Sequence, residues 1–264
     1  MKLSALTTIA GLAVASMAQA QEESPYSFFV GGSLGYVIGD YELGAAGKAI
    51  GLGDWDEPIH ALQLGVENRG PHGSHGSAFF LEVGLTENDA RSRGGAKGSE
   101  VKTELDSLFG TGAGSTLLQG VFPNYADTDI ITATLNVDVE IIPITLNYRN
   151  EYDLAGELNY YFGLGAGIAL VDIKTRFGLS NNNGDPAVAD SASFDDSTYY
   201  VHIFAGLSYD LNESFAVFGG ARYIFMGNID LGNTNLGAAG ADFTSTDSPI
   251  DHAVQFELGA RFSF

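Results

Sequence analysis

The last eleven residues, 254–264, read VQFELGARFSF and alternate apolar and polar side chains up to the final residue. The apolar face carries Val254, Phe256, Leu258, Ala260, Phe262 and Phe264. The polar face carries Gln255, Glu257, Gly259, Arg261 and Ser263. A period of two is the pattern of a β-strand whose two faces meet different surroundings. The chain is therefore expected to end in such a strand.

Seven more segments alternate in the same way, which predicts eight strands in total. The other seven lie at about 26–38, 59–68, 77–86, 129–150, 157–173, 198–210 and 214–226. Long connections (39–58, 87–128, 174–197, 227–251) take turns with short ones (69–76, 151–156, 211–213). Outer-membrane barrels combine short periplasmic turns with long extracellular loops. We therefore predict an all-β fold, an eight-stranded antiparallel up-and-down transmembrane β-barrel with four long extracellular loops.

The segment 129–150 contains a change of parity. Odd-numbered residues up to Ile141 are apolar, whereas from Ile142 onward the even-numbered residues are apolar. A bulge near Pro143 would produce this change within one strand, and a tight turn there would produce two strands. Nine strands would break the alternation of long and short connections. We therefore expect a bulge at Pro143.

The N-terminus has the pattern of a secretory signal peptide. Lys2 precedes an apolar stretch, and Ala18-Gln19-Ala20 is a small-x-small cleavage site. We predict a signal peptide at 1–20 and a barrel domain at 21–264, the alternative being a buried N-terminal helix. The longest later apolar run, 160–171, is shorter than the about 20 residues that a spanning helix needs. Only a closed barrel would then satisfy the backbone in lipid.

Charge and composition restrict the function. The net charge is −21, and removal of residues 1–20 with Lys2 leaves 11 − 33 = −22. Such a chain repels nucleic acid. Cysteine is absent, and the acidic loops, which include Asp185, match no calcium motif. His72 and His75 share a short turn without further ligands nearby. We predict no metal site and no cofactor, and divalent cations that bridge the acidic loops to lipopolysaccharide stay an open hypothesis.

The chain resembles the small bacterial outer-membrane β-barrel proteins, the group with OmpA-, OmpX- and OmpW-type barrels. The likeness rests on the signal peptide, the strand ELNYYFGLGAGIALV at 157–171, the hairpin around Asn212 and the final strand. It implies export to the bacterial outer membrane, with outer-membrane lipid and lipopolysaccharide as surroundings. It also implies that Phe256, Phe262 and Phe264 form a signal for the outer-membrane assembly machinery. It identifies no extracellular partner.

Charged side chains of both signs lie on the face opposite the apolar one. They predict a lumen network of Glu67, Glu82, Glu140, Arg149, His202, Arg222, Glu257 and Arg261. An eight-stranded barrel is just wide enough for its own side chains, so such charges must be paired. The network is either a structural plug or the gate of a narrow pore. Gly163, Gly165 and Gly167 on this face are expected to make room for Tyr161, Phe204 and Phe218.

These observations favour a structural or surface-interaction protein with a closed lumen. The alternatives are a narrow channel for small solutes, a lipid-active barrel enzyme and a soluble lipocalin-like binder. No catalytic residue is predicted, because His202 has no Ser or Asp at a telling spacing and His60 and His252 lie near the loop-side rim. An enzyme is not expected.

Overall fold

The computed structural model describes residues 26–40, 54–68, 76–183, 185, 188–227, 234–236, 241–243 and 252–264. The predicted signal peptide lies outside these residues, as do His72 and His75. The signal peptide, the histidine-containing turn and a barrel domain beginning at residue 21 therefore stay predictions.

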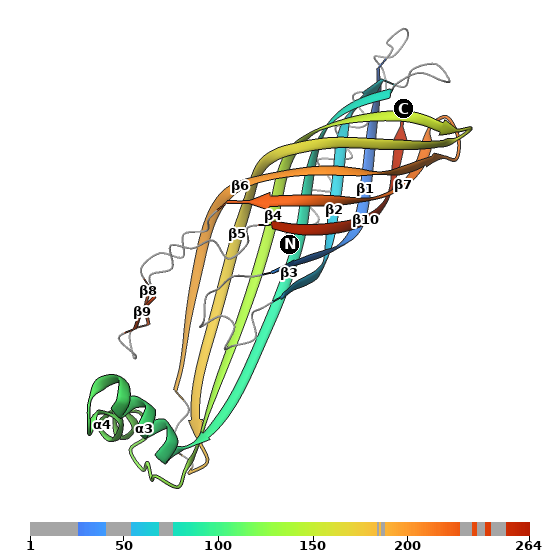
Figure 1. Ribbon diagram of the computed structural model, residues 1–264. Helices are drawn as coiled ribbons and strands as arrows, with labels where there is room; N and C mark the ends of the chain where they lie inside the picture. Colours follow the sequence, from blue (N-terminus) through green and yellow to red (C-terminus); the bar gives the residue numbers. More distant parts are fainter. Residues whose placement is uncertain are drawn as a thin grey trace.

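Eight antiparallel strands close into a barrel (Figure 1), which confirms the predicted fold class. They are β1 (Ser27–Asp40), β2 (Asp54–Asn68), β3 (Gly76–Lys97), β4 (Ile130–Ala155), β5 (Leu158–Asn181), β6 (Val188–Asp210), β7 (Phe215–Met226) and β10 (His252–Ser263). The ring order is β1-β10-β7-β6-β5-β4-β3-β2. The final strand closes the ring by pairing with both β1 and β7. A separate hairpin joins β8 (Thr234–Leu236) and β9 (Ala241–Phe243).

The apolar face of the barrel points outward. Leu258 is 73% exposed, Leu146 64% and Leu34 63%, whereas the polar side chains of the same strands are buried. A lipocalin-like barrel would have the opposite arrangement, because it keeps its apolar face inside. The outward apolar band identifies a transmembrane barrel and rules out the soluble alternative.

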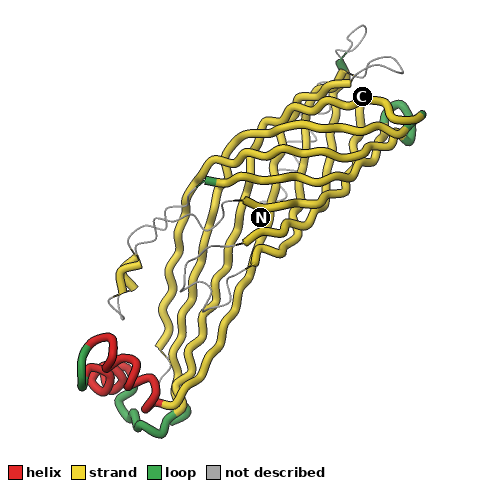
Figure 2. The backbone as a smooth tube through the Cα atoms, viewed as in Figure 1, coloured by secondary structure: helices red, strands yellow, loops and turns green. Residues whose placement is uncertain are grey.

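Four neighbouring strands continue beyond the barrel. Figures 1 and 2 show β3, β4, β5 and β6 running on together as an open four-stranded sheet. This sheet, here called the extension, comprises residues 87–97, 130–140, 172–181 and 188–197, and its strands stay paired almost to their ends. The predicted loops 87–128 and 174–197 are therefore partly wrong, because 87–97 and most of 174–197 are strand.

The outward face changes from apolar to polar where the extension begins. On β4, Ile142, Ile144 and Leu146 point outward, and the preceding outward residues are Glu140, Asp138 and Asn136. The β4–β5 register is unbroken from Ile131/Asn181 to Asp153/Asn159. The predicted bulge at Pro143 is therefore wrong, and so is the turn. The parity of the apolar pattern changes because the strand's surroundings change from lipid to water, while the strand itself stays regular.

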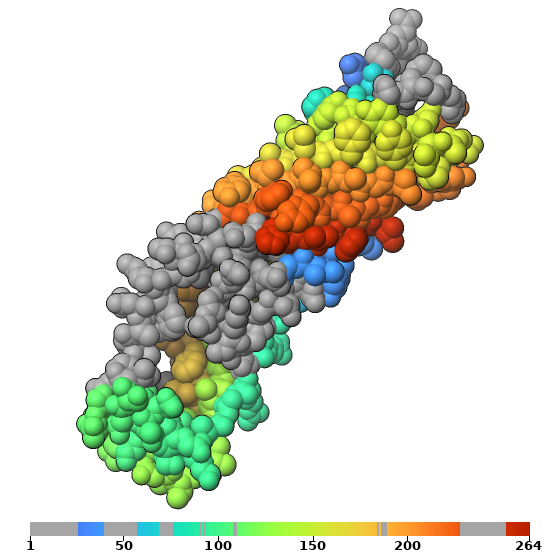
Figure 3. All heavy atoms as spheres, viewed as in Figure 1, coloured from blue at the N-terminus to red at the C-terminus, as the bar shows by residue number. Residues whose placement is uncertain are grey.

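Two helices cover the tip of the extension, a feature that the sequence analysis missed. They are α3 (Gly98–Phe109) and α4 (Ala113–Val121), and Figure 3 shows them at the end far from the barrel. Leu118 and Phe122 pack on Ile131 of β4. Gly112 precedes α4 at φ 91°, a conformation that favours glycine, and its N–H donates to Asp106. Among the described residues, no helix is long and apolar enough to cross a membrane.

Hydrogen bonds join the β5–β6 connection to the segment that follows α4; this segment and the two helices are here called the cap. Asp185 accepts from the Asn124 amide at 2.6 Å and from the Asn181 amide at 2.9 Å. The side chain of Asn183 donates to the Asn124 carbonyl at 2.7 Å. Asp185, one of the acidic loop residues, thus has its carboxylate occupied by amide donors and helps to order the tip.

A matched pair of substitutions on the outward face of β4 tests the change of surroundings. Leu146→Arg places a cation within the apolar band and is expected to cost about 2–4 kcal/mol of folding free energy. Thr132→Arg, on the same face of the extension and paired with the uncharged Gly95 and Ser180, is expected to change it by less than about 0.5 kcal/mol. Urea titration of the protein in lipid vesicles measures both, and equal costs would contradict the assignment.

Candidate functional site: the charged interior of the barrel

The structure brings seven of the eight predicted network residues together inside the barrel. These buried side chains are Glu67, Glu82, Arg149, His202, Arg222, Glu257 and Arg261. They come from β2, β3, β4, β6, β7 and β10, so the network joins most of the ring.

Glu140 is the exception and corrects the prediction. It points outward from the extension, is only partly buried, and pairs in register with Glu87 and Asp172. Its assignment to the lumen depended on a bulge at Pro143. Because β4 is regular, Glu140 lies on the face opposite Arg149.

Arg222 organises one part of the interior, the Arg222 cluster. Its Nε and Nη2 donate to Glu257 at 3.1 and 2.8 Å, and Nη2 also donates to Glu82 at 2.7 Å. Nη1 pairs with the other Glu82 oxygen. Gln63 donates to Glu82 at 2.8 Å, and His202 Nε2 lies 2.8 Å from Asn147 Oδ1. One guanidinium thus bridges two buried carboxylates, which is the pairing that a buried charge requires.

A second group, the Arg149–Arg261 cluster, lies nearer the short turns. Arg149 Nη2 is 3.6 Å from Glu67 and 3.4 Å from Glu151, and Arg261 Nε is 3.3 Å from Glu67. Arg261 Nη1 is 3.2 Å from Glu151. Glu151 was not among the predicted network residues, because the predicted strand ended at residue 150. Its place two residues after Arg149, on the same face, was the available signal.

Aromatic rings link the two clusters. Phe29, Phe80, Tyr161, Phe204 and Phe218 form one buried group. The Arg222 guanidinium carbon lies 5.5 Å from the centre of the Phe204 ring. The Arg149 carbon lies 5.6 Å from the centre of the Tyr161 ring, and the Arg261 carbon 6.0 Å from that of Phe29. These distances fit cation–π contacts.

Glycines on the inward face give these bulky side chains their space. A Cβ at Gly163 would overlap the ring of Phe204, and one at Gly206 would overlap Tyr161. At Gly165, a Cβ would overlap His202 and Asn147. Large side chains therefore pack over glycines of neighbouring strands. This was expected for Gly163 with Phe204, whereas Gly165 makes room for His202 and Asn147 rather than for the predicted aromatic rings. At Gly167 the obstacle is the backbone of Ile144 and Thr145.

An apolar layer lies at the end of the barrel that bears the extension. It consists of Val37, Ile59, Ile141, Ala169, Val171, Tyr200, Ile224, Met226 and Ala253. The Tyr200 ring contacts the His202 ring, with centroids 5.6 Å apart, so this layer touches the Arg222 cluster. The sequence analysis did not identify this layer.

The interior provides fixed charge pairs and no nucleophile–base pair around His202. Its Nε2 contacts Asn147 and Arg222, neither of which is a nucleophile. His60 and His252 point outward, and His252 stacks on the Tyr223 ring. Among the described residues, no cluster of three or more His, Cys, Asp or Glu has a geometry suited to a metal ion.

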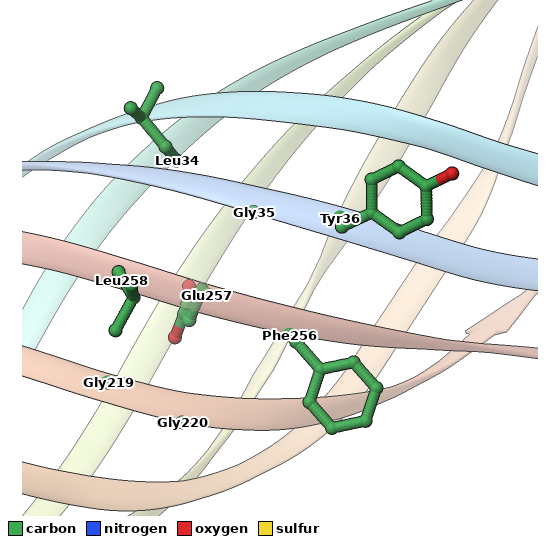
Figure 4. Close-up of a pocket in the computed structure, with 8 residues that line it drawn as sticks. All are labelled: Leu34, Gly35, Tyr36, Gly219, Gly220, Phe256, Glu257 and Leu258. Atoms are coloured by element: carbon green, nitrogen blue, oxygen red, sulfur yellow. The ribbon is translucent and has the colours of Figure 1, made fainter.

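A shallow hollow lies on the outside of the barrel, where β1, β10 and β7 meet (Figure 4). Leu34, Tyr36, Phe256 and Leu258 line it beside Gly219. It belongs to the lipid-facing surface. Phe256 and Phe262 also face outward, and the Phe264 N–H donates to the Phe28 carbonyl at 2.9 Å. These positions are the structural context of the predicted assembly signal, which stays a prediction.

No protein-family model matches the chain, and no curated protein matches it. Neisserial surface protein A is a similar solved structure, with 11% identity, TM-score 0.40, and coverage of 92% of this chain and 100% of that one. Ail, the attachment invasion locus protein of Yersinia pestis, has 13% identity, TM-score 0.34, and coverage of 90% and 97%. A major outer membrane protein from Thermus thermophilus has 13% identity, TM-score 0.39, and coverage of 90% and 99%. Likeness at this level adds nothing to the topology described above.

Arg222 is expected to be the most sensitive residue of the interior. Arg222→Leu leaves Glu82 and Glu257 buried without a cation, which costs about 3–5 kcal/mol. Adding Glu82→Gln and Glu257→Gln removes the unpaired charge and is expected to restore most of the loss. Urea unfolding in vesicles provides the measurement. A single variant that costs less than about 1 kcal/mol would show that the pairing is not required.

Proposed function

We propose that the chain is a bacterial outer-membrane β-barrel of the surface-interaction type, with a lumen closed by its own side chains. The extension is the part that would carry this surface interaction. The observation that carries this proposal is the continuation of four paired strands past the apolar band, with a polar outward face and an ordered cap. A barrel that serves only as a membrane anchor does not require such a sheet.

The arrangement of the interior supports a closed lumen rather than a channel. Charged groups that line an ion path must remain available to water and to the solute. Here Arg222 is fully engaged with Glu82 and Glu257, and aromatic and apolar layers lie on either side of the Arg222 cluster. The network then serves as the structural plug rather than as a gate.

The expected surroundings follow from the exterior. The apolar band would contact outer-membrane lipid and lipopolysaccharide, and Phe256, Phe262 and Phe264 would present the final strand to the assembly machinery. We propose no cofactor and no catalytic role. Because β1 begins and β10 ends on the side of the short turns, the extension would lie outside the cell.

Planar-bilayer recording tests the closed lumen. The wild-type protein is expected to show no discrete conductance steps. A variant with Phe80, Phe204 and Phe218 changed to Ala removes much of the aromatic layer and is expected to gain current, which controls for insertion. Regular steps in the wild-type protein that change in Arg222→Ala would favour the narrow channel instead.

A further inference from the structure

The described cations occupy only two regions of the molecule. Nine of the twelve Lys and Arg residues are described, three inside the barrel and six on the extension and its cap. The inner three are Arg149, Arg222 and Arg261. The outer six are Arg91, Arg93, Lys97, Lys102, Lys174 and Arg176. The positive charge that a partner meets on the described surface is therefore confined to the extension and cap.

Three arginines gather on the outward face of the extension. Arg91 of β3 pairs with Asn136 of β4, which pairs with Arg176 of β5, so the three side chains form one row across the sheet. Arg93 points the same way two residues further along β3. Strands lie about 4.8 Å apart, which places the Cα atoms of Arg91 and Arg176 about 10 Å apart. We call Arg91, Arg93 and Arg176 the basic face.

The basic face is only partly compensated, by Asp89 and Asp138 in the next row of the same sheet face toward the membrane. Within the described parts of the chain, neither Arg91 nor Arg93 has a hydrogen bond or an ion pair from its side chain. Arg176 Nη2 is 3.9 Å from Asp138, and its side chain is 66% exposed. Exposed guanidinium groups with few ion pairs can bind tetrahedral oxyanions through paired N–H donors.

Lys174 lies on the same sheet face, but unlike the three arginines it has a close anionic partner. It donates to Asp172 at 2.9 Å, and this hydrogen bond raises the pKa of the Lys174 ammonium. Its charge is therefore already partnered. This difference makes Lys174 suitable for a control variant.

The position of the basic face argues against anionic phospholipid as its partner. Arg91 lies 91 − 85 = 6 residues beyond Leu85, an outward apolar residue of the band on β3. Six residues span about 20 Å of strand, or about 15 Å of height at a tilt of about 40°. The headgroup region adds only about 5–8 Å to each side of the hydrocarbon.

Carboxylates lie between the apolar band and the basic face. Glu87, Glu140, Asp172 and Asp195 are paired in register across the four strands, immediately beyond the band. Anionic groups at the membrane surface meet this row first and are repelled. An anion that approaches from outside the membrane meets the three arginines directly.

We propose that the basic face binds a polysaccharide from outside the cell through its sulfate or phosphate esters. Three guanidinium groups spread over about 10 Å fit a chain with several anionic groups better than a single small anion. The net charge of the whole chain is −21, so the described surface outside the extension and cap, which carries no cation, repels such a ligand. The proposal rests on the proposed function, because the extension must lie outside the cell.

The test uses immobilised heparin, a sulfated polysaccharide, and the full chain in phospholipid nanodiscs. The combined variant Arg91→Gln, Arg93→Gln and Arg176→Gln is expected to weaken binding about tenfold or more. The matched control, Lys97→Gln, Lys102→Gln and Lys174→Gln, loses the same charge from the extension and cap and is expected to stay within about threefold. Rising salt weakens the wild-type interaction. Heat-modifiable migration in gels verifies that each variant is folded.

Several outcomes would overturn the proposal. Equal losses in the two variants would mean that net charge alone matters, and unchanged binding in the arginine variant would exclude the basic face. If lipopolysaccharide in the nanodisc abolishes heparin binding and the arginine variant releases that lipid, the ligand belongs to the protein's own membrane. If a DNA duplex binds as tightly as heparin, the basic face attracts polyanions in general and has no preference for a polysaccharide. A conducting wild-type protein that still binds heparin through these arginines would contradict only the proposed function.

Discussion

Each strand face must match the medium that it meets, and the rest of this structure depends on that constraint. On β4 the outward side chains are apolar from Ile142 toward the short turns and polar from Glu140 toward the tip. The inward side chains change in the opposite sense, from Arg149 and Asn147 in the barrel to Val139 and Val137 in the extension. One uninterrupted strand thus serves two environments. The reversal of polarity marks where the chain leaves the membrane.

The same constraint explains the interior. An outward apolar face leaves the polar residues inside a narrow barrel, where unpaired charge is strongly unfavourable. Arg222, Arg149 and Arg261 are paired with Glu82, Glu257, Glu67 and Glu151, and the aromatic rings lie against their guanidinium groups. Inward glycines such as Gly163 provide the space for the rings. These mutually dependent pairs are the basis of the closed lumen proposed above.

Local periodicity was sufficient to predict the eight strands and most of the buried network, because side-chain direction follows from parity alone. It was insufficient where the medium changes. A reversal of polarity and a β-bulge both change the parity of the apolar residues in the sequence. For this reason a bulge was wrongly predicted at Pro143, and Glu140 was wrongly placed in the lumen. Segments such as 87–97 and 188–197 lack the apolar outward face of membrane strands and resemble loops. Glu151 was missed only because the predicted strand ended at residue 150, whereas β4 continues to Ala155.

Accessibility along β4 tests the central claim most directly, and the absence of native cysteine makes single-cysteine scanning possible. Labelled cysteines at even positions from 142 to 148 are predicted to be quenched by lipid-borne quenchers. Those at even positions from 132 to 140 are predicted to react only with water-soluble reagents, and those at 145 and 147 with neither. Lipid quenching at 134–138 would contradict the reversal of surroundings, and rapid reaction at 145 or 147 with a water-soluble reagent would contradict the closed interior.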